Sequence, residues 1–375
     1  MSTSIGTPHS AALPRLGRGR AVAAGGLIAI AAIAYQLLTE HRIASLGLFA
    51  LALALGAVFL LAEFGYTGAF RAWLRHGDGA ALAAGILVAL VAALVIVPVS
   101  ALVDGYGGFI APIGLPVIGG AALFGVGMQL ANGCGSGTLY AAGGGSRRMW
   151  VTLPFFCLGG LAGSLVLPAA LRLPALPAVS LAAQFGPWGG LAATLALGAA
   201  LIALVLRRGP RPTPRQIGIA VLIGALAGGA FLLSGLPWGI TTGLTLWGAK
   251  IASMLGADLA HTTYWSWDGP KQDLAGSILH QDSSLMDLGL ILGATLAASW
   301  RGSFLAQRVP PARQLLAAAL GGLAMGFGAR LAFGCNIGAL VGGIASGSLH
   351  GFVWFFAALA GNWLGIRLRP RFGLA

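Results

Sequence analysis

Two glycine-rich turns, each carrying one cysteine, hold the residue types in this 375-residue chain that could do chemistry. The first turn centres on Cys134 and reads NGCGSG, and the second centres on Cys335 and reads FGCNIG. Glycines beside a cysteine leave the backbone uncrowded, so its N–H groups can approach a ligand closely. A neutral thiol adds a weak donor and a soft, polarizable sulfur. The combination suits a small anion that has a soft atom of its own.

The two turns occupy equivalent places in an internal repeat. A shift of 201 residues, the separation of Cys134 from Cys335, also superposes eight further identical residues. Because the chain has only three cysteines, the cysteine match is far less expected by chance than the glycine matches. Cys157 has no repeat partner, and we expect it to be an ordinary packing residue. The other identical pairs are Gly120 and Gly321, Gly125 and Gly326, Gly127 and Gly328, Leu130 and Leu331, Ala131 and Ala332, Gly133 and Gly334, Gly137 and Gly338, and Leu139 and Leu340.

A weaker correspondence adds two more turns. A shift of 175 residues places Thr67-Gly68 on Thr242-Gly243, and each pair follows an apolar run and begins a shortened apolar segment. Interrupted segments at corresponding places in two halves of a membrane protein indicate a binding site. The chain therefore offers four candidate loops, two with thiols and two with Thr-Gly pairs.

Composition places these loops inside a membrane. The chain is 57% hydrophobic and 8% charged, whereas a soluble domain is about 25% charged. The apolar runs are about 18 residues or longer, which predicts membrane helices and not a barrel. The net charge of +13 is almost all arginine, which we interpret as a topology signal and not as nucleic-acid binding. Histidine spacing matches no metal site, and we expect neither a metal nor a cofactor.

The pattern of runs predicts an all-α membrane protein with about 9–11 transmembrane helices plus short re-entrant segments. If every arginine-rich loop lies in the cytoplasm, both termini are cytoplasmic and the halves have inverted topology around a central pathway. The predicted parts are a cytoplasmic tail at 1–20, a first half at 21–206, a cytoplasmic linker at 207–215 and a second half at 216–375.

The four loops resemble those of the YeeE/YedE family of bacterial membrane proteins. The matching stretches are FGYTGAFR at 64–71, NGCGSGTLYAAGGG at 132–145, WGITTGLTLWGAK at 238–250 and FGCNIGALVGGIASGSLHG at 333–351. The resemblance implies a bacterial inner-membrane importer in which cysteines along a central path pass thiosulfate inward. It also implies a cytoplasmic sulfurtransferase-like partner. Thiosulfate importers of the family carry a further cysteine in the first loop, at the position that we align with Gly65.

The predicted function is thus import of thiosulfate or a related small sulfur-containing anion, by a protein that is not an enzyme. Glycine-turn amides supply donors at a helix N-terminus, and hydroxyl and amide side chains add others. Arg330 and Lys250 are candidates to draw the anion, although an arginine at a span end often snorkels. The candidate pathway residues are Cys134, Cys335, Gly133, Gly135, Gly334, Asn132, Asn336, Ser136, Thr67, Thr242, Gly65, Arg330 and Lys250.

Two alternatives stay open at this stage. In the first, Cys134 or Cys335 accepts a sulfur atom as a persulfide, so that the protein is a membrane sulfur-relay enzyme. A nucleophilic thiol needs a nearby base, and no His or Lys is adjacent to Cys134, which favours the transporter. In the second, the protein is a passive anion channel.

Overall fold

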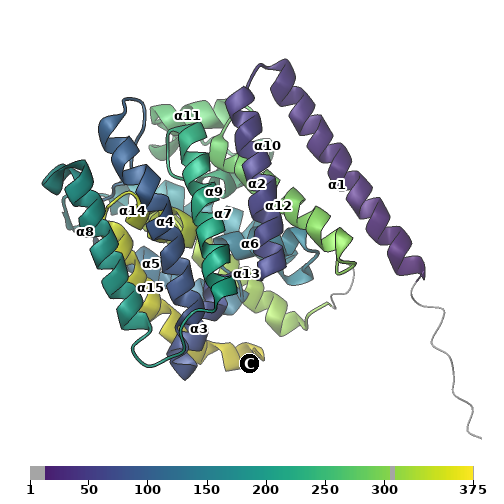
Figure 1. Ribbon diagram of the computed structural model, residues 1–375. Coiled ribbons are helices and arrows are strands. Elements are labelled where there is room, and N and C mark those ends of the chain that lie inside the picture. The colour runs from purple at the N-terminus through teal and green to yellow at the C-terminus, as the bar shows by residue number, and fades with distance from the viewer. Residues whose placement is uncertain (1–12, 305–308, 375) are drawn as a thin grey trace, which may run out of the picture.

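The computed structural model describes residues 13–304 and 309–374 as a bundle of α-helices (Figure 1). Residues 1–12 of the predicted tail lie outside the described residues, and helix α1 already begins at Leu13, so 13–20 are helical. The helices of the first half are α1 (Leu13–Thr39), α2 (Ile43–Ala62), α3 (Tyr66–His76), α4 (Ala80–Leu102), α5 (Leu115–Ala131), α6 (Gly135–Gly143), α7 (Arg147–Ala170) and α8 (Leu181–Val205). Two-residue strands β1 (Ile113–Gly114) and β2 (Ala175–Leu176) pair antiparallel, with Ile113 opposite Leu176.

The second half continues the helical pattern. A capping box between Thr213 and Gln216 begins α9, as expected for a threonine three residues before a glutamine. The elements are α9 (Pro214–Ser234), α10 (Thr241–Met254), the 3-10 turn η1 (Tyr264–Ser266), α11 (Asp268–Ala275), α12 (Asp282–Trp300), α13 (Ala312–Leu331), the π-helix η2 (Asn336–Gly342), α14 (Gly343–Ala345), α15 (Leu349–Leu368) and the 3-10 turn η3 (Arg369–Phe372).

Ten segments of the described chain are long and apolar enough to cross a membrane, which confirms the predicted class. Three of them join a long helix to a short one at a break: α2 to α3, α5 to α6, and α13 to η2 and α14. The short helix α10 lies outside these ten spans. The four predicted loops are therefore the places where α3, α6, α10 and η2 begin.

The centre of the bundle is a glycine-mediated crossing of α5 and α13. A Cβ on Gly120 would lie 2.6 Å from the carbonyl oxygen of Gly328, and a Cβ on Gly127 would lie 2.7 Å from that of Gly321. These pairs require α5 and α13 to run antiparallel. The repeat makes Gly120 equivalent to Gly321, and Gly127 equivalent to Gly328. The two contacts are therefore the same contact seen from each half of the repeat. Small residues at such crossings let helix backbones touch.

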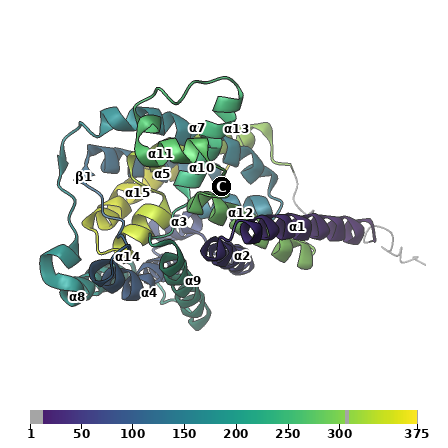
Figure 2. The same ribbon diagram turned by 90° about the horizontal axis from the view of Figure 1, so that it is seen from above.

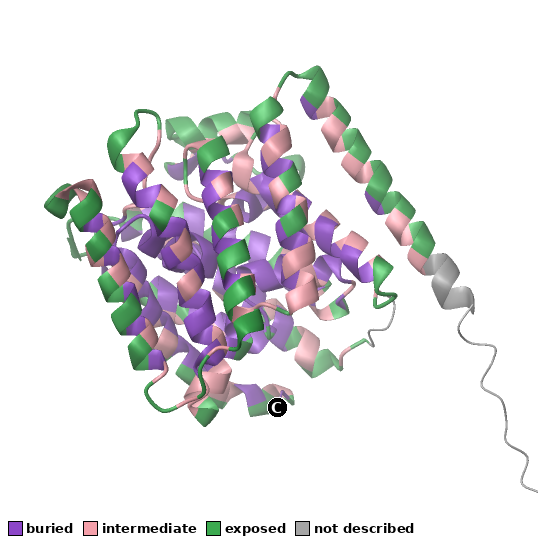
Figure 3. Ribbon diagram, viewed as in Figure 1, coloured by how far each residue is buried: buried purple, intermediate pink, exposed green. Residues whose placement is uncertain are grey.

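The helices around this crossing differ strongly in burial. Helix α1 stands at the edge of the bundle, where it packs on α12 and α2 (Figure 2). Buried residues concentrate in the middle of the molecule, while α1, α8 and α9 expose much of their surface (Figure 3). The loops that begin α3, α6, α10 and η2 belong to the buried centre, since their residues Tyr66, Cys134, Ile240 and Cys335 share one core cluster.

The bundle has two opposite ends, which we name by their residues. The loop face carries the segment 253–285 with α11, and the basic face carries the end of α3 and the C-terminal η3 (Figure 1). Gly77 after α3 and Gly209 in the predicted linker touch on the basic face. The arginine-rich loops of both halves therefore gather at one end.

Close helix contact makes a stability prediction. A Cβ on Gly361 of α15 would lie 1.8 Å from the carbonyl oxygen of Ala122 in α5, so Gly361→Ala must push the two helices apart. We expect the free energy of unfolding to fall by about 3 kcal/mol, which is the upper end of the cost of overpacking. The measurement is the unfolding temperature in detergent, which should be lower than that of the wild type. Gly119→Ala is the matched control, because a Cβ there meets nothing within 4 Å. Equal unfolding temperatures for the two variants would contradict the prediction.

Candidate functional site

The two cysteine loops share backbone conformations at two pairs of equivalent positions. Asn132 and Phe333, which are equivalent in the repeat, both adopt left-handed conformations, with φ of 60° and 57°. Cys134 and Cys335 follow in extended conformations, with φ of −97° and −92°. A left-handed backbone is strained at a bulky residue such as Phe333, and strain of this kind is usual at functional sites. The sequence repeat thus extends to the backbone at these two positions, although an α-helix follows Cys134 and a π-helix follows Cys335.

Cys134 is the N-cap residue of α6. Its sulfur accepts a hydrogen bond from the backbone N–H of Gly137 at 3.4 Å and lies 3.5 Å from the hydroxyl oxygen of Ser136. The side chain is 1% exposed. Because the sulfur occupies a helix N-terminus, it sits where backbone N–H groups and the helix dipole favour negative charge.

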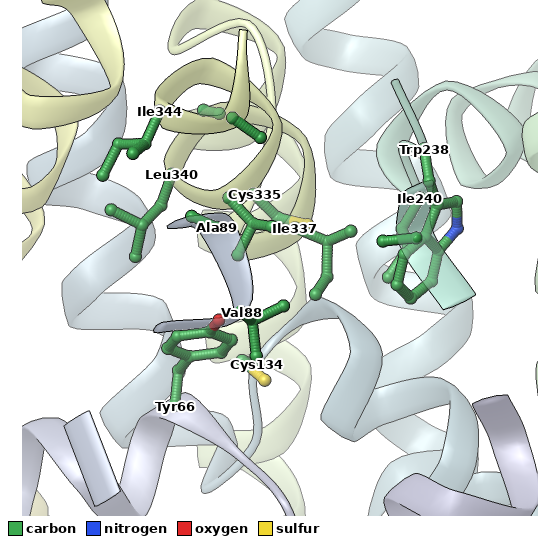
Figure 4. Packing of buried hydrophobic residues seen from close by; sticks show 14 of the residues in the cluster. Tyr66, Val88, Ala89, Cys134, Trp238, Ile240, Cys335, Ile337, Leu340 and Ile344 are labelled. Atoms are coloured by element: carbon green, nitrogen blue, oxygen red, sulfur yellow. The ribbon is translucent and has the colours of Figure 1, made fainter. Parts of the chain in front are cut away.

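The Cys134 loop packs directly against the thiol of Cys335. A Cβ on Gly135 would lie 2.9 Å from the sulfur of Cys335, so only a glycine fits beside that thiol. Tyr66 of α3 is close enough to interact electrostatically with both cysteines. Figure 4 shows Tyr66, Cys134, Cys335 and Trp238 around this point, where all four predicted loops meet.

Several buried polar atoms here have no hydrogen-bond partner within the described chain. They include the Thr67 hydroxyl, the Trp238 indole N–H and the Asn336 side-chain amide. Buried polar groups are nearly always paired, and leaving one unpaired costs about 1–3 kcal/mol. Three unpaired donors in loops that converge on two thiols therefore indicate a site for a polar ligand.

A cavity of about 370 Å³ reaches this site from the loop face. Trp238, Thr242, Gly334 and Gly338 line it, so it ends beside the Cys335 loop. Asp273 lies on its wall, and burial raises the pKa of that carboxyl. Asp282 adds to the rise and Lys250 opposes it.

An arginine cluster lies at the other end of the Cys134 loop, on the basic face. Arg71 donates to the Asn132 side-chain oxygen at 2.8 Å, and Arg369 donates to the same oxygen at 3.1 Å. Arg148 donates to the carbonyl oxygen of Leu130 at 2.9 Å. Neither Arg71 nor Arg148 forms a salt bridge with any described residue. Cations held without acids attract anions.

The remaining predicted residues are placed differently. Lys250 donates to the carbonyl oxygens of Leu274 and Gly276 at 2.5 and 2.6 Å, so it anchors the segment 253–285. Arg330 donates to the Tyr264 hydroxyl at 2.6 Å and stacks on that ring. Burial raises the pKa of Tyr264, while Arg330 opposes that rise. Both cations therefore support the loop face and do not reach the two thiols.

Two other predicted residues frame the Cys134 loop. Gly133 packs against Met149, and Gly65 lies opposite the Tyr140 hydroxyl, which would be 3.2 Å from a Cβ at that position. The Thr67 carbonyl oxygen accepts a hydrogen bond from Gln129 at 3.1 Å, and this ties α3 to α5. The first Thr-Gly loop is thereby fixed to the helix that leads into Cys134.

Sequence reasoning missed the arginine cluster and Asp287. Asp287 of α12 is a fully buried acid whose two carboxylate oxygens lack hydrogen-bond partners in the described structure. A carboxylate inside an apolar span is itself a functional signal, and it could have identified this residue. Only the folded chain shows that Arg71, Arg148 and Arg369 converge. Within the described residues, no group of acids, histidines and cysteines could hold a metal ion.

Comparison with known proteins gives one family. A profile of the family described as "Sulphur transport" matches residues 61–364, which span all four loops. This match covers far more than half of the chain.

Individual relatives overlap the chain in part. A "Probable transporter YedE" of Escherichia coli K12 is 34% identical over 152 residues, which is 40% of this chain and 37% of the relative. A "Thiosulfate transporter TsuA" of Spirochaeta thermophila is 28% identical over 271 residues, 66% of this chain and 75% of that protein. The E. coli K12 TsuA is 28% identical over 285 residues, with 72% of its length covered. The chain thus spans about a third of the YedE proteins that it matches.

Proposed function

Because the chain belongs to the sulphur transport family, we propose that it imports thiosulfate or a related small sulfur-containing anion across the bacterial inner membrane. The anion enters the cavity on the loop face, passes Cys335 and then Cys134, and leaves at the arginine cluster on the basic face. Arginine-rich loops collect in the cytoplasm, so the basic face and both termini are cytoplasmic in this proposal. The two halves are inverted repeats that meet at the glycine crossing of α5 and α13.

The observation that carries this proposal is the set of buried, unpaired donors next to the two thiols. Thr67, Trp238 and Asn336 keep donors unused in the described structure, and an oxyanion would accept from them. A thiol would contact the soft terminal sulfur of thiosulfate without holding it tightly, as conduction requires. A pore for a dianion also needs positive potential beyond the constriction, which Arg71 and Arg148 would supply.

Gly65 bears on the identity of the substrate. The first loop resembles that of thiosulfate importers, which carry a cysteine at this position. In this chain the Tyr140 hydroxyl lies near the same place. We propose that Tyr140 substitutes as the donor at the last step before the basic face. A cytoplasmic sulfurtransferase-like protein would receive the anion there.

The direct test is uptake of labelled thiosulfate, sulfite and selenium analogues into cells that lack their own importers. We expect saturable uptake of thiosulfate that unlabelled thiosulfate competes. The Gly65→Cys variant should retain it. No uptake of any of these anions above cells with an empty vector would refute the proposal.

The arginine cluster gives a separate prediction. Arg148→Gln should lower thiosulfate uptake about fivefold, since one partly screened charge near a dianion contributes about 1 kcal/mol. The loss should shrink at high ionic strength, because salt screens this charge. The matched control is Arg147→Gln, which removes an exposed arginine beside it. A similar loss in both variants would show that the net charge of the face matters and not the cluster.

A further inference from the structure

Asp287 is a buried acid without any described role. It lies in α12, within the membrane span Asp282–Trp300, and its side chain is 0% exposed. Neither carboxylate oxygen has a hydrogen-bond partner among the described residues. An ionised carboxylate in such a place is very costly, so the neutral acid is the form that this packing accommodates.

The carboxyl lies directly behind the wall of the cavity. One oxygen would be 2.6 Å from a Cβ on Gly243, so it touches the α10 backbone next to Thr242. Thr242 precedes Gly243 in the chain, and Met286 precedes Asp287. Both Thr242 and Met286 line the cavity. Asp287 also interacts electrostatically with Cys335. The acid therefore lies beside the proposed path, close to Cys335.

Among the described residues, no cation forms a salt bridge with Asp287. Lys250 on α10 donates its hydrogen bonds to the carbonyl oxygens of Leu274 and Gly276. The neighbour on α7 is the thiol Cys157, and α2 contributes no titratable side chain. On α12 itself the nearest acid is Asp282, five residues earlier at the mouth of the cavity. The charge of Asp287 is thus set by whether the carboxyl binds a proton, and an anion in the path disfavours the ionised form.

We propose that Asp287 couples anion import to proton import, an inference that rests on the proposed function. The carboxylate takes a proton from the cavity while the path is open to the loop face. The resulting neutral acid no longer repels a dianion beside Cys335, so the anion passes. The proton then leaves to the basic face, and the short-lived carboxylate takes a new proton from the cavity, so that the neutral acid is the resting form. Each cycle moves a proton with the dianion, which lowers the net negative charge carried against an inside-negative membrane potential.

The test uses the full-length protein in liposomes with a trapped pH-sensitive dye and an inward thiosulfate gradient. The wild type should acidify the lumen as thiosulfate enters. Asp287→Asn mimics the protonated acid, so it should exchange labelled for unlabelled thiosulfate within about twofold of the wild-type rate. Its gradient-driven acidification should fall at least tenfold. Asp268→Asn, which removes an exposed acid of the loop face outside the cavity lining, should acidify the lumen like the wild type.

The outcomes separate the two proposals. Absence of thiosulfate exchange by the wild type would overturn the proposed function and this inference with it. Thiosulfate entry without acidification in the wild type would overturn proton coupling alone, and needs no variant. Acidification by Asp287→Asn at the wild-type rate would remove Asp287 as the proton carrier. If Asp287→Asn fails to fold, Asp287→Glu replaces it. That variant keeps the titratable group, so acidification should persist, and its loss with exchange intact would count against the inference.

Discussion

Cells that produce the Cys335→Ala variant should take up thiosulfate about 30-fold more slowly than cells with the wild type. The thiol is 0% exposed at the inner end of the cavity, and its neighbours Ile240 and Ile337 are buried and apolar. Alanine would leave a dianion without a donor at this point. A hydrogen bond to a charged group contributes about 1.5–3 kcal/mol, and about 2 kcal/mol corresponds to a 30-fold change in rate.

The three cysteines provide an internal control for this experiment. Cys134→Ala should cause a loss of similar size, because the Cys134 loop packs against the Cys335 thiol through Gly135. Cys157→Ala should leave uptake near the wild-type level, since that thiol lies in α7 and packs against the α10 backbone at Gly248. Uptake is measured at matched protein levels in the membrane. If all three variants lose uptake equally, the thiols act through stability and the proposed path is wrong.

Gly135→Ala should reduce uptake about 20-fold while both thiols remain in place. The new methyl carbon would lie 2.9 Å from the Cys335 sulfur and 3.3 Å from its Cβ. It would also touch Ile240 at 3.9 Å, so it would fill the gap between the two cysteine loops. Overpacking costs about 1–3 kcal/mol, and about 1.8 kcal/mol corresponds to a 20-fold slower passage.

Gly119→Ala serves as the control for Gly135→Ala, because it adds the same methyl group where nothing lies within 4 Å. It should transport thiosulfate normally. Unfolding temperature in detergent should separate obstruction from unfolding. A Gly135→Ala variant with wild-type stability and wild-type uptake would mean that the anion does not pass between Cys134 and Cys335.

Sequence alone was sufficient for the helical membrane class and for the positions of the four loops. Both depend on local properties: long apolar runs must become membrane helices, and the glycines in each loop favour a break in the helix. The repeat shift also paired Cys134 with Cys335 correctly as equivalent backbone positions, since their φ values agree within a few degrees. The start of helix α1 near the N-terminus was not predicted, because its polar first turns do not resemble a membrane span. The sequence placed residues 13–20 in a tail, and they are helical.

Tertiary structure decided which charged residues belong to the site. Lys250 follows one candidate loop in sequence and Arg330 precedes another, yet carbonyl groups and Tyr264 of the segment 253–285 bind them. Conversely, Arg71 and Arg369 are far apart in sequence but donate to one Asn132 oxygen. Long-range contacts of this kind follow from how the antiparallel helices pack, and packing depends on all helices at once. A local pattern reports that a cation is present, and only the fold determines what it faces.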